Sequence, residues 1–212
     1  MAWTLRGYQQ LAVDRGAAYL RGELPGDGGG LIVLPPGAGK SIVIAEIVKR
    51  LDGPCIVFQP SAEILQQNAN KLLAVGADPK VYSSSMRSRE VGGITLATIG
   101  SVKDRPDVFD AFPYVMVDEC HRVSAKGGMY KEFFEALGDI RLLGLTATPF
   151  RLSSNGYEGS VLKFLTRTRP RVFTQVVAYA QIGELIDRGY LVKPTYQIVS
   201  GFDRSQVPVN SH

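Results

Sequence analysis

An apolar run, a glycine-rich turn and a helical segment follow one another within residues 31–51. Residues 31–34 are all apolar and predict a short buried strand, while residues 42–51 have the apolar spacing of a helix. The turn between them reads Leu34-Pro35-Pro36-Gly37-Ala38-Gly39-Lys40-Ser41. Glycines let the backbone N–H groups of such a turn surround an anion, and the helix that follows presents the positive end of its dipole. The stretch therefore predicts a phosphate-binding loop.

The residue types of this loop predict a site for a nucleotide polyphosphate with Mg²⁺. Lys40 would contact the β- and γ-phosphates, and the Ser41 hydroxyl would bind the metal. Leu34 replaces the usual first glycine, and the alternative is a glycine turn that carries a lysine by chance. The order of strand, turn and helix favours nucleotide binding. The predicted contacts are Pro36, Gly37, Ala38, Gly39, Lys40, Ser41 and Ile42.

Two adjacent acids, Asp118 and Glu119, come directly after the apolar run 114–117. Acids at the end of a buried strand are costly unless they meet a cation or a reacting group. Asp118 is therefore a predicted Mg²⁺ ligand, and Glu119 is predicted to orient or deprotonate a water molecule. The alternative is an acidic surface turn. We expect Ser41 and Asp118 to meet across neighbouring strand tips at one edge of the sheet.

Other polar residues accompany these two motifs. His121 adjoins the acids, and we expect it to connect the nucleotide site with another segment. Thr146 and Thr148 follow the strand expected over residues 141–145, and their hydroxyls would reach the acids or His121 if the two strands are neighbours. Ordinary strand-end threonines fit the pattern equally well. Gln9, on a helix expected over residues 5–21, has an amide suited to the edge of adenine, although a solvated helix position explains it better.

The whole chain of 212 residues is long enough for one α/β domain with a sizeable core. Its short apolar runs, such as residues 55–58, are typical of parallel strands covered by helices on both faces. A further helix should begin after Ser61, with its apolar stripe inward and Gln66, Gln67 and Asn68 outward or toward a partner. The cations of residues 163–171 are expected to be solvated.

Charge and composition narrow the class of protein. A net charge of +4 mildly favours an anionic partner. Two cysteines are too few for a disulfide scaffold, and no apolar run approaches the roughly 18 residues of a membrane span. The first residues lack the apolar core of a signal peptide. We therefore expect a cytoplasmic protein that does not enter a membrane.

Four segments in this order resemble the first RecA-like domain of superfamily 2 helicases, and most closely that of RadD-like DNA repair helicases. They are Leu5-Arg6-Gly7-Tyr8-Gln9, Pro35 to Ser41, Asp118-Glu119-Cys120-His121 and Thr146-Ala147-Thr148. The resemblance implies a RecA-like P-loop NTPase fold with a mostly parallel central sheet. Residues 1–200 would form the ATP-binding domain, and residues 201–212 a tail or the start of an interdomain linker.

The resemblance also implies roles for single residues. The cofactors would be ATP and Mg²⁺, with adenine recognised by Gln9 together with Arg6. Lys40, Asp118 and Glu119 would be catalytic. ATP would be coupled to nucleic acid by His121, Thr146 and Thr148. The nucleic acid, with DNA favoured, would be contacted by Pro60, Ser61, Thr98, Gly100 and Ser101. About three phosphate contacts would give single-strand binding a log–log salt slope of about −2.

The sequence departs from the family pattern in three ways. Pro36 stands where threonine is usual, and Ala62 where an arginine is frequent. A second RecA-like domain with its arginine finger is missing, so we expect a monomer that binds ATP and hydrolyses it slowly without that partner. Two alternatives stay open: the motor of a restriction-type translocase, and a nucleotide-dependent nucleic-acid-binding module without useful hydrolysis.

Overall fold

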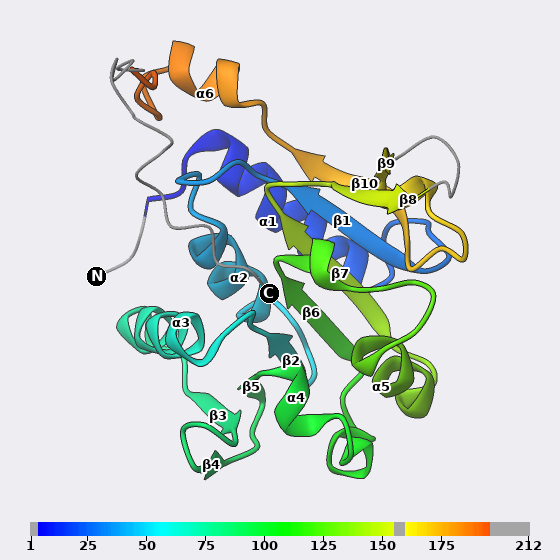
Figure 1. Ribbon diagram of the computed structural model, residues 1–212. Coiled ribbons are helices and arrows are strands. Elements are labelled where there is room, and N and C mark those ends of the chain that lie inside the picture. Colours follow the sequence, from blue (N-terminus) through cyan, green and yellow to red (C-terminus); the bar gives the residue numbers. More distant parts are fainter. Residues whose placement is uncertain (1–3, 155–159, 196–212) are drawn as a thin grey trace, which may run out of the picture.

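The computed structural model describes residues 4–154 and 160–195, and its centre is an eight-stranded sheet. The strand order is β10-β1-β7-β6-β2-β5-β3-β4, and every pairing is parallel except that of β3 with β4 (Figure 1). The strands are β1 (Gly29–Val33), β2 (Cys55–Phe58), β3 (Pro79–Ser83), β4 (Ser88–Arg89), β5 (Ile94–Ala97), β6 (Tyr114–Asp118), β7 (Arg141–Thr146) and β10 (Phe173–Tyr179). The predicted α/β fold with a mostly parallel sheet is confirmed.

Helices cover both faces of the sheet, as predicted (Figure 1). The helices are α1 (Gly7–Leu20), α2 (Lys40–Val48), α3 (Ala62–Ala74), α4 (Ile99–Val102), α5 (Met129–Leu137) and α6 (Ile182–Asp187), with short 3₁₀ turns η1 (Pro106–Phe109), η2 (Cys120–Arg122) and η3 (Leu165–Arg167). No helix in the described part of the chain is both long enough and apolar enough to cross a membrane.

The central strands are apolar throughout because successive side chains enter two different cores. Ile56 packs with Phe109 and Phe133 on the face covered by α4 and α5. Val57, the next residue, packs with residues of α1, α2 and α3 on the other face. This alternation explains why continuous apolar runs predicted the strands correctly.

A small antiparallel pair, β8 (Phe150–Ser154) and β9 (Ser160–Phe164), lies beyond the end of β7. The sequence analysis did not predict this pair or β10, which occupies the edge of the sheet beside β1. The expected extended segment 191–199 lies partly, and the tail 201–212 wholly, outside the described residues. The prediction for Asn68 was wrong, because its side chain is buried and donates to the Gln59 Oε1 atom at 2.7 Å.

Candidate nucleotide and nucleic-acid site

The glycine turn follows β1 and leads into α2 with the backbone that a phosphate loop needs. Gly37 and Gly39 have φ angles of +77° and +84°, a region that other residues rarely adopt. Lys40 and Ser41 begin α2, and the first N–H groups of a helix have no partner within it. These groups and the dipole of α2 together can bind an anion.

Helix α1 holds this loop from behind. The Tyr8 hydroxyl and the Gln9 Nε2 atom both donate to the Ala38 carbonyl at 2.9 Å, and Gln9 Oε1 accepts from the Arg6 backbone N–H. The sequence analysis favoured a solvated helix position for Gln9. This prediction was wrong, because the residue is only 6% exposed. Its amide still has one N–H and one oxygen lone pair beyond these bonds. The guanidinium of Arg6 lies 4.6 Å above the ring of Tyr190.

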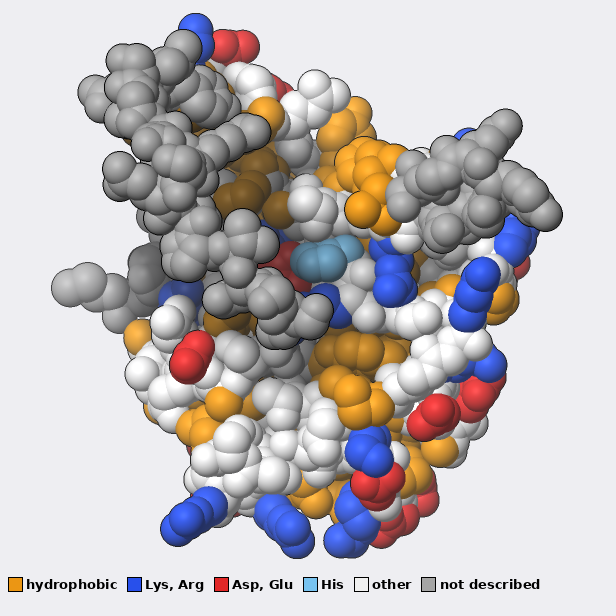
Figure 2. Space-filling view, viewed as in Figure 1, with side chains coloured by type: hydrophobic (Ala, Val, Ile, Leu, Met, Phe, Trp, Pro, Cys, Tyr) orange, Lys and Arg blue, Asp and Glu red, His pale blue; other side chains and the backbone are white. Residues whose placement is uncertain are grey.

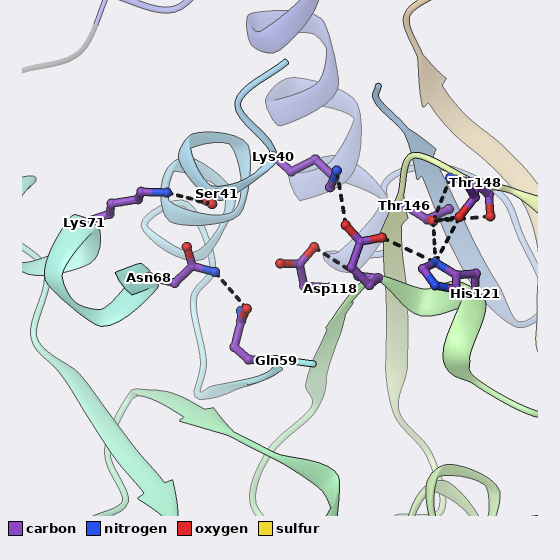
Figure 3. Close-up of polar contacts among 10 residues, drawn as sticks. Lys40, Ser41, Gln59, Asn68, Lys71, Asp118, His121, Thr146 and Thr148 are labelled. Carbon is purple, nitrogen blue, oxygen red and sulfur yellow. Dashed lines mark hydrogen bonds and ion pairs between the residues drawn. The ribbon is translucent and has the colours of Figure 1, made fainter. Parts of the chain in front are cut away.

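The acids lie at the end of β6, at the same edge of the sheet as the loop (Figure 3). Asp118 is 5% exposed, and burial, together with the neighbouring Glu119 charge, raises its pKa to about 6, while Lys40 and Lys71 act in the opposite direction. Glu119 has a left-handed backbone (φ 50°), which costs a residue other than glycine roughly 1–3 kcal/mol. A strained acid and a buried acid together indicate a functional site.

A chain of polar contacts runs from the loop lysine to the end of β7 (Figure 3). Lys40 Nζ lies 3.3 Å from Glu119 Oε1, and Glu119 Oε2 lies 3.3 Å from His121 Nδ1. The same ring nitrogen is 3.0 Å from Thr146 Oγ1 and 3.1 Å from Thr148 Oγ1. The predicted catalytic and coupling residues are therefore brought together in one network.

The strand arrangement differs from the expectation in one respect. β6 pairs with β7, so the condition under which the threonines would reach the acids or His121 is met, and it is His121 that they contact. β1, however, pairs with β7 and β10, so β7 lies between the strand that precedes the loop and the strand that delivers Asp118. The expected neighbouring tips are thus wrong, although both groups lie at one edge. Lys40 and Glu119 nevertheless reach each other across the end of β7.

The hydroxyl of Ser41 has a partner that the sequence did not reveal. Lys71 of α3 donates to Ser41 Oγ at 3.2 Å. Within the described ranges, no three His, Cys, Asp or Glu side chains form a metal cluster. One hydroxyl and one carboxylate beside a phosphate loop fit Mg²⁺, which usually takes one or two protein ligands together with substrate phosphates and water.

Three of the five predicted nucleic-acid residues line a hollow of about 500 Å³ beside this network, which we call the strand hollow. Pro60, Thr98 and Gly100 line it from the ends of β2 and β5, which are parallel neighbours. Ser101 and Ser61 are not among its lining residues. The Ser101 hydroxyl bonds with Thr98 Oγ1 at 2.8 Å, and the Ser61 hydroxyl caps α3 by accepting from Ile64 N at 3.3 Å.

Sequence reasoning missed several residues of the strand hollow. Gln59 is among its lining residues, is 1% exposed, and has a buried Nε2 atom with no hydrogen-bond partner in the described part of the chain. Arg122 also lines it and donates to the Pro60 carbonyl at 2.8 Å. Tyr130 adds an aromatic ring from α5. Of these three residues, only Arg122 could have been recognised as a site residue from the sequence, because it directly follows the acidic motif.

Comparison with known proteins places residues 2–151 in the family described as "Type III restriction enzyme, res subunit". A "51.5 kDa protein" of a Lactococcus phage is 31% identical over 131 residues, which cover 60% of this chain and 26% of the relative. The "DNA 3'-5' translocase XPB2" of Sulfurisphaera tokodaii is 32% identical over 151 residues, covering 69% of this chain and 31% of the relative. The chain thus spans between a quarter and a third of the length of these relatives.

Solved structures share the fold. The type ISP restriction-modification enzyme LlaGI, bound to a DNA substrate mimic, matches with a TM-score of 0.62 at 15% identity, over 89% of this chain and 21% of that chain. The UvsW helicase of bacteriophage T4 matches with a TM-score of 0.52 at 18% identity, over 68% of this chain and 52% of that chain.

Proposed function

Because the chain belongs to the type III restriction enzyme res subunit family, we propose that it is the ATP-binding motor domain of a DNA helicase or translocase, with a role in DNA repair. The observation that carries this proposal is the contact chain from Lys40 through Glu119 and His121 to Thr146. It connects the predicted phosphate loop to the end of another strand, beside a hollow lined by three of the five predicted nucleic-acid residues. The names of the XPB2 and LlaGI relatives agree with an action on DNA.

The site assigns a task to each group. Lys40 and the first N–H groups of α2 would bind the β- and γ-phosphates of ATP, while Ser41 and Asp118 would hold Mg²⁺. Mg²⁺, when bound, neutralises charge on the phosphates. Glu119 would orient the attacking water and accept its proton, and Gln9 with Arg6 would recognise adenine. His121, Thr146 and Thr148 would transmit the state of Glu119 toward the strand hollow.

Turnover by this chain alone should be low. In P-loop enzymes an arginine finger accelerates hydrolysis by about 10³–10⁵. We propose that this arginine belongs to a second RecA-like domain, that residues 1–200 form the first domain, and that residues 201–212 are a tail or the start of an interdomain linker. The chain would act as a monomer, and its two free, buried cysteines suit a cytoplasmic location.

The substitution Glu119→Gln tests the proposal. It keeps the size of the side chain but removes the proton acceptor, so the residual ATP hydrolysis should fall at least tenfold while ATP affinity changes less than threefold. Hydrolysis is measured by phosphate release and affinity by titration with a fluorescent ATP analogue.

Exposed Glu135→Gln is the matched control and should change neither quantity. Equal turnover in the Glu119→Gln and wild-type chains would contradict hydrolysis at this site. It would favour the alternative of a binding module without useful hydrolysis. A restriction-type translocase shares the same ATP site, and the family description favours it as the second candidate.

A further inference from the structure

Five cations from three segments line a second hollow, which we call the basic hollow. It has a volume of about 440 Å³ and lies where the β8–β9 pair meets the segment that follows the acidic motif. No aspartate or glutamate is among the described residues that line it. The cations are Lys126, Arg151, Lys163, Arg167 and Arg169.

Within the described ranges, none of these five charges has an acidic partner. Every ion pair found between described residues involves other cations. Arg151 is held in place, since its guanidinium donates to the Val123 carbonyl at 2.6 Å. Like charges that gather at one concave surface repel one another and create a positive potential, which favours an anionic ligand. Basic side chains gather on this face beside the pale blue histidine (Figure 2).

The basic hollow continues the strand hollow. Ser124 lines both, and the segment 124–128 forms the wall between them, with Lys126 on the basic side and Gly127 and Gly128 on the other. A polyanion that passes Pro60 and Thr98 therefore reaches the basic hollow by crossing this short wall. Leu152, which is 71% exposed, lines the basic hollow and offers an apolar contact for a sugar or base.

We propose that the basic hollow is a second nucleic-acid site, which binds the backbone phosphates of the same strand that occupies the strand hollow. This inference rests on the proposed function. Arginine and lysine contacts to phosphate position a strand without reading its sequence, so the site would be indifferent to base identity. Two further phosphate contacts would steepen the expected salt slope from about −2 to about −3.5 on single strands.

The double variant Lys163→Gln/Arg167→Gln tests the inference. Binding of a fluorescent 20-nucleotide oligothymidylate is followed by anisotropy at several salt concentrations, with a non-hydrolysable ATP analogue and Mg²⁺. We expect affinity at about 50 mM salt to fall at least tenfold and the slope to become shallower by about 1.4, which corresponds to two lost phosphate contacts. The charge-conserving variant Lys163→Arg/Arg167→Lys should retain most of the wild-type affinity for the oligonucleotide.

The matched control is Arg15→Gln/Lys49→Gln, which removes the same charge from α1 and the end of α2, away from both hollows. Equal affinity and slope in the test and control variants, with a wild type that binds, would overturn the basic hollow and leave the proposed function intact. A wild type that binds the nucleotide but no oligonucleotide would refute nucleic-acid binding itself. Polyglutamate binding that falls in the test variant while oligonucleotide binding does not would assign the hollow to an acidic protein.

Discussion

At the scale of single residues, the site combines groups that are individually unfavourable. Asp118 is buried with a raised pKa, and Glu119 adopts a backbone that few residues tolerate. Neither feature helps the nucleotide-free chain to fold. Both place a carboxylate where a metal or a water molecule would use it, so this part of the chain gives up stability for function.

Asp118→Asn should therefore stabilise the protein when nucleotide and metal are absent. An acid whose folded pKa is raised destabilises the fold increasingly as the pH rises through the window between about 4 and 6. A shift of about two units corresponds to at most roughly 3 kcal/mol. Urea unfolding in EDTA should show this gain at pH 8 and roughly half of it at pH 5.

Exposed Asp104→Asn serves as the control for this measurement, because it removes a surface carboxylate whose one ion-pair partner among the described residues is Lys103. A gain for Asp118→Asn that is equal at both pH values would show that the buried charge is not its source.

The effect of Lys71 on Mg²⁺ binding can be measured apart from that of Asp118. Its ammonium donates to the hydroxyl that we assign to Mg²⁺, and it lies close enough to Asp118 to lower that pKa. Lys71→Met should free Ser41 and lower the Mg²⁺ concentration for half-maximal nucleotide binding by about fivefold, which corresponds to one hydrogen bond of about 1 kcal/mol. Titration of Mg²⁺ at constant nucleotide analogue measures this. Weaker nucleotide binding at every Mg²⁺ concentration would instead assign Lys71 to the phosphates.

At the scale of elements, α3 begins at a residue for which the sequence predicts two roles. Ser61 was predicted both to begin this helix and to contact nucleic acid, and the cap is confirmed by its bond from Ile64 N. The helix in turn carries Asn68 against Gln59 and Lys71 against Ser41. Helix α3 therefore contacts both the strand hollow, through Gln59, and the nucleotide loop, through Ser41.

Ser61→Asp separates the two roles. Aspartate is as good a cap as serine, and its charge suits the helix N-terminus, so thermal stability should change by less than about 0.5 kcal/mol. The same charge should repel a phosphate and weaken oligonucleotide binding several-fold. Ser61→Ala is the companion variant, and it should lose about 1 kcal/mol of stability. Unchanged oligonucleotide affinity in Ser61→Asp would limit Ser61 to the helix cap.

At the scale of the whole molecule, the site is assembled from the ends of strands that are far apart in the sequence. The loop after β1, the acids after β6 and the threonines of β7 share one edge because their strands run parallel. The residues predicted to bind the nucleotide and three of those predicted to contact nucleic acid then lie at the same edge, which is the arrangement that the proposed motor needs to couple the two.

Local chemistry was sufficient to predict most of the elements and the phosphate loop. Buried parallel strands are apolar on both faces, glycines permit the turn, and Ser61 suits a cap, all of which are properties of short segments. Strand β10 was not predicted, because it is an edge strand that contains polar residues and follows a basic run. Leu31 and Ile32 could likewise be placed in a strand without knowing which core each would enter.

The strand order and the contacts between distant segments were decided by long-range packing alone. The insertion of β7 between β1 and β6, the contact of Lys71 with Ser41 and the gathering of five cations at the basic hollow each join residues from distant segments. Such contacts depend on strand order and on how loops meet at the sheet edge. Periodicity and residue type describe only a residue's immediate neighbours, so they carry no information about which remote side chain it will meet.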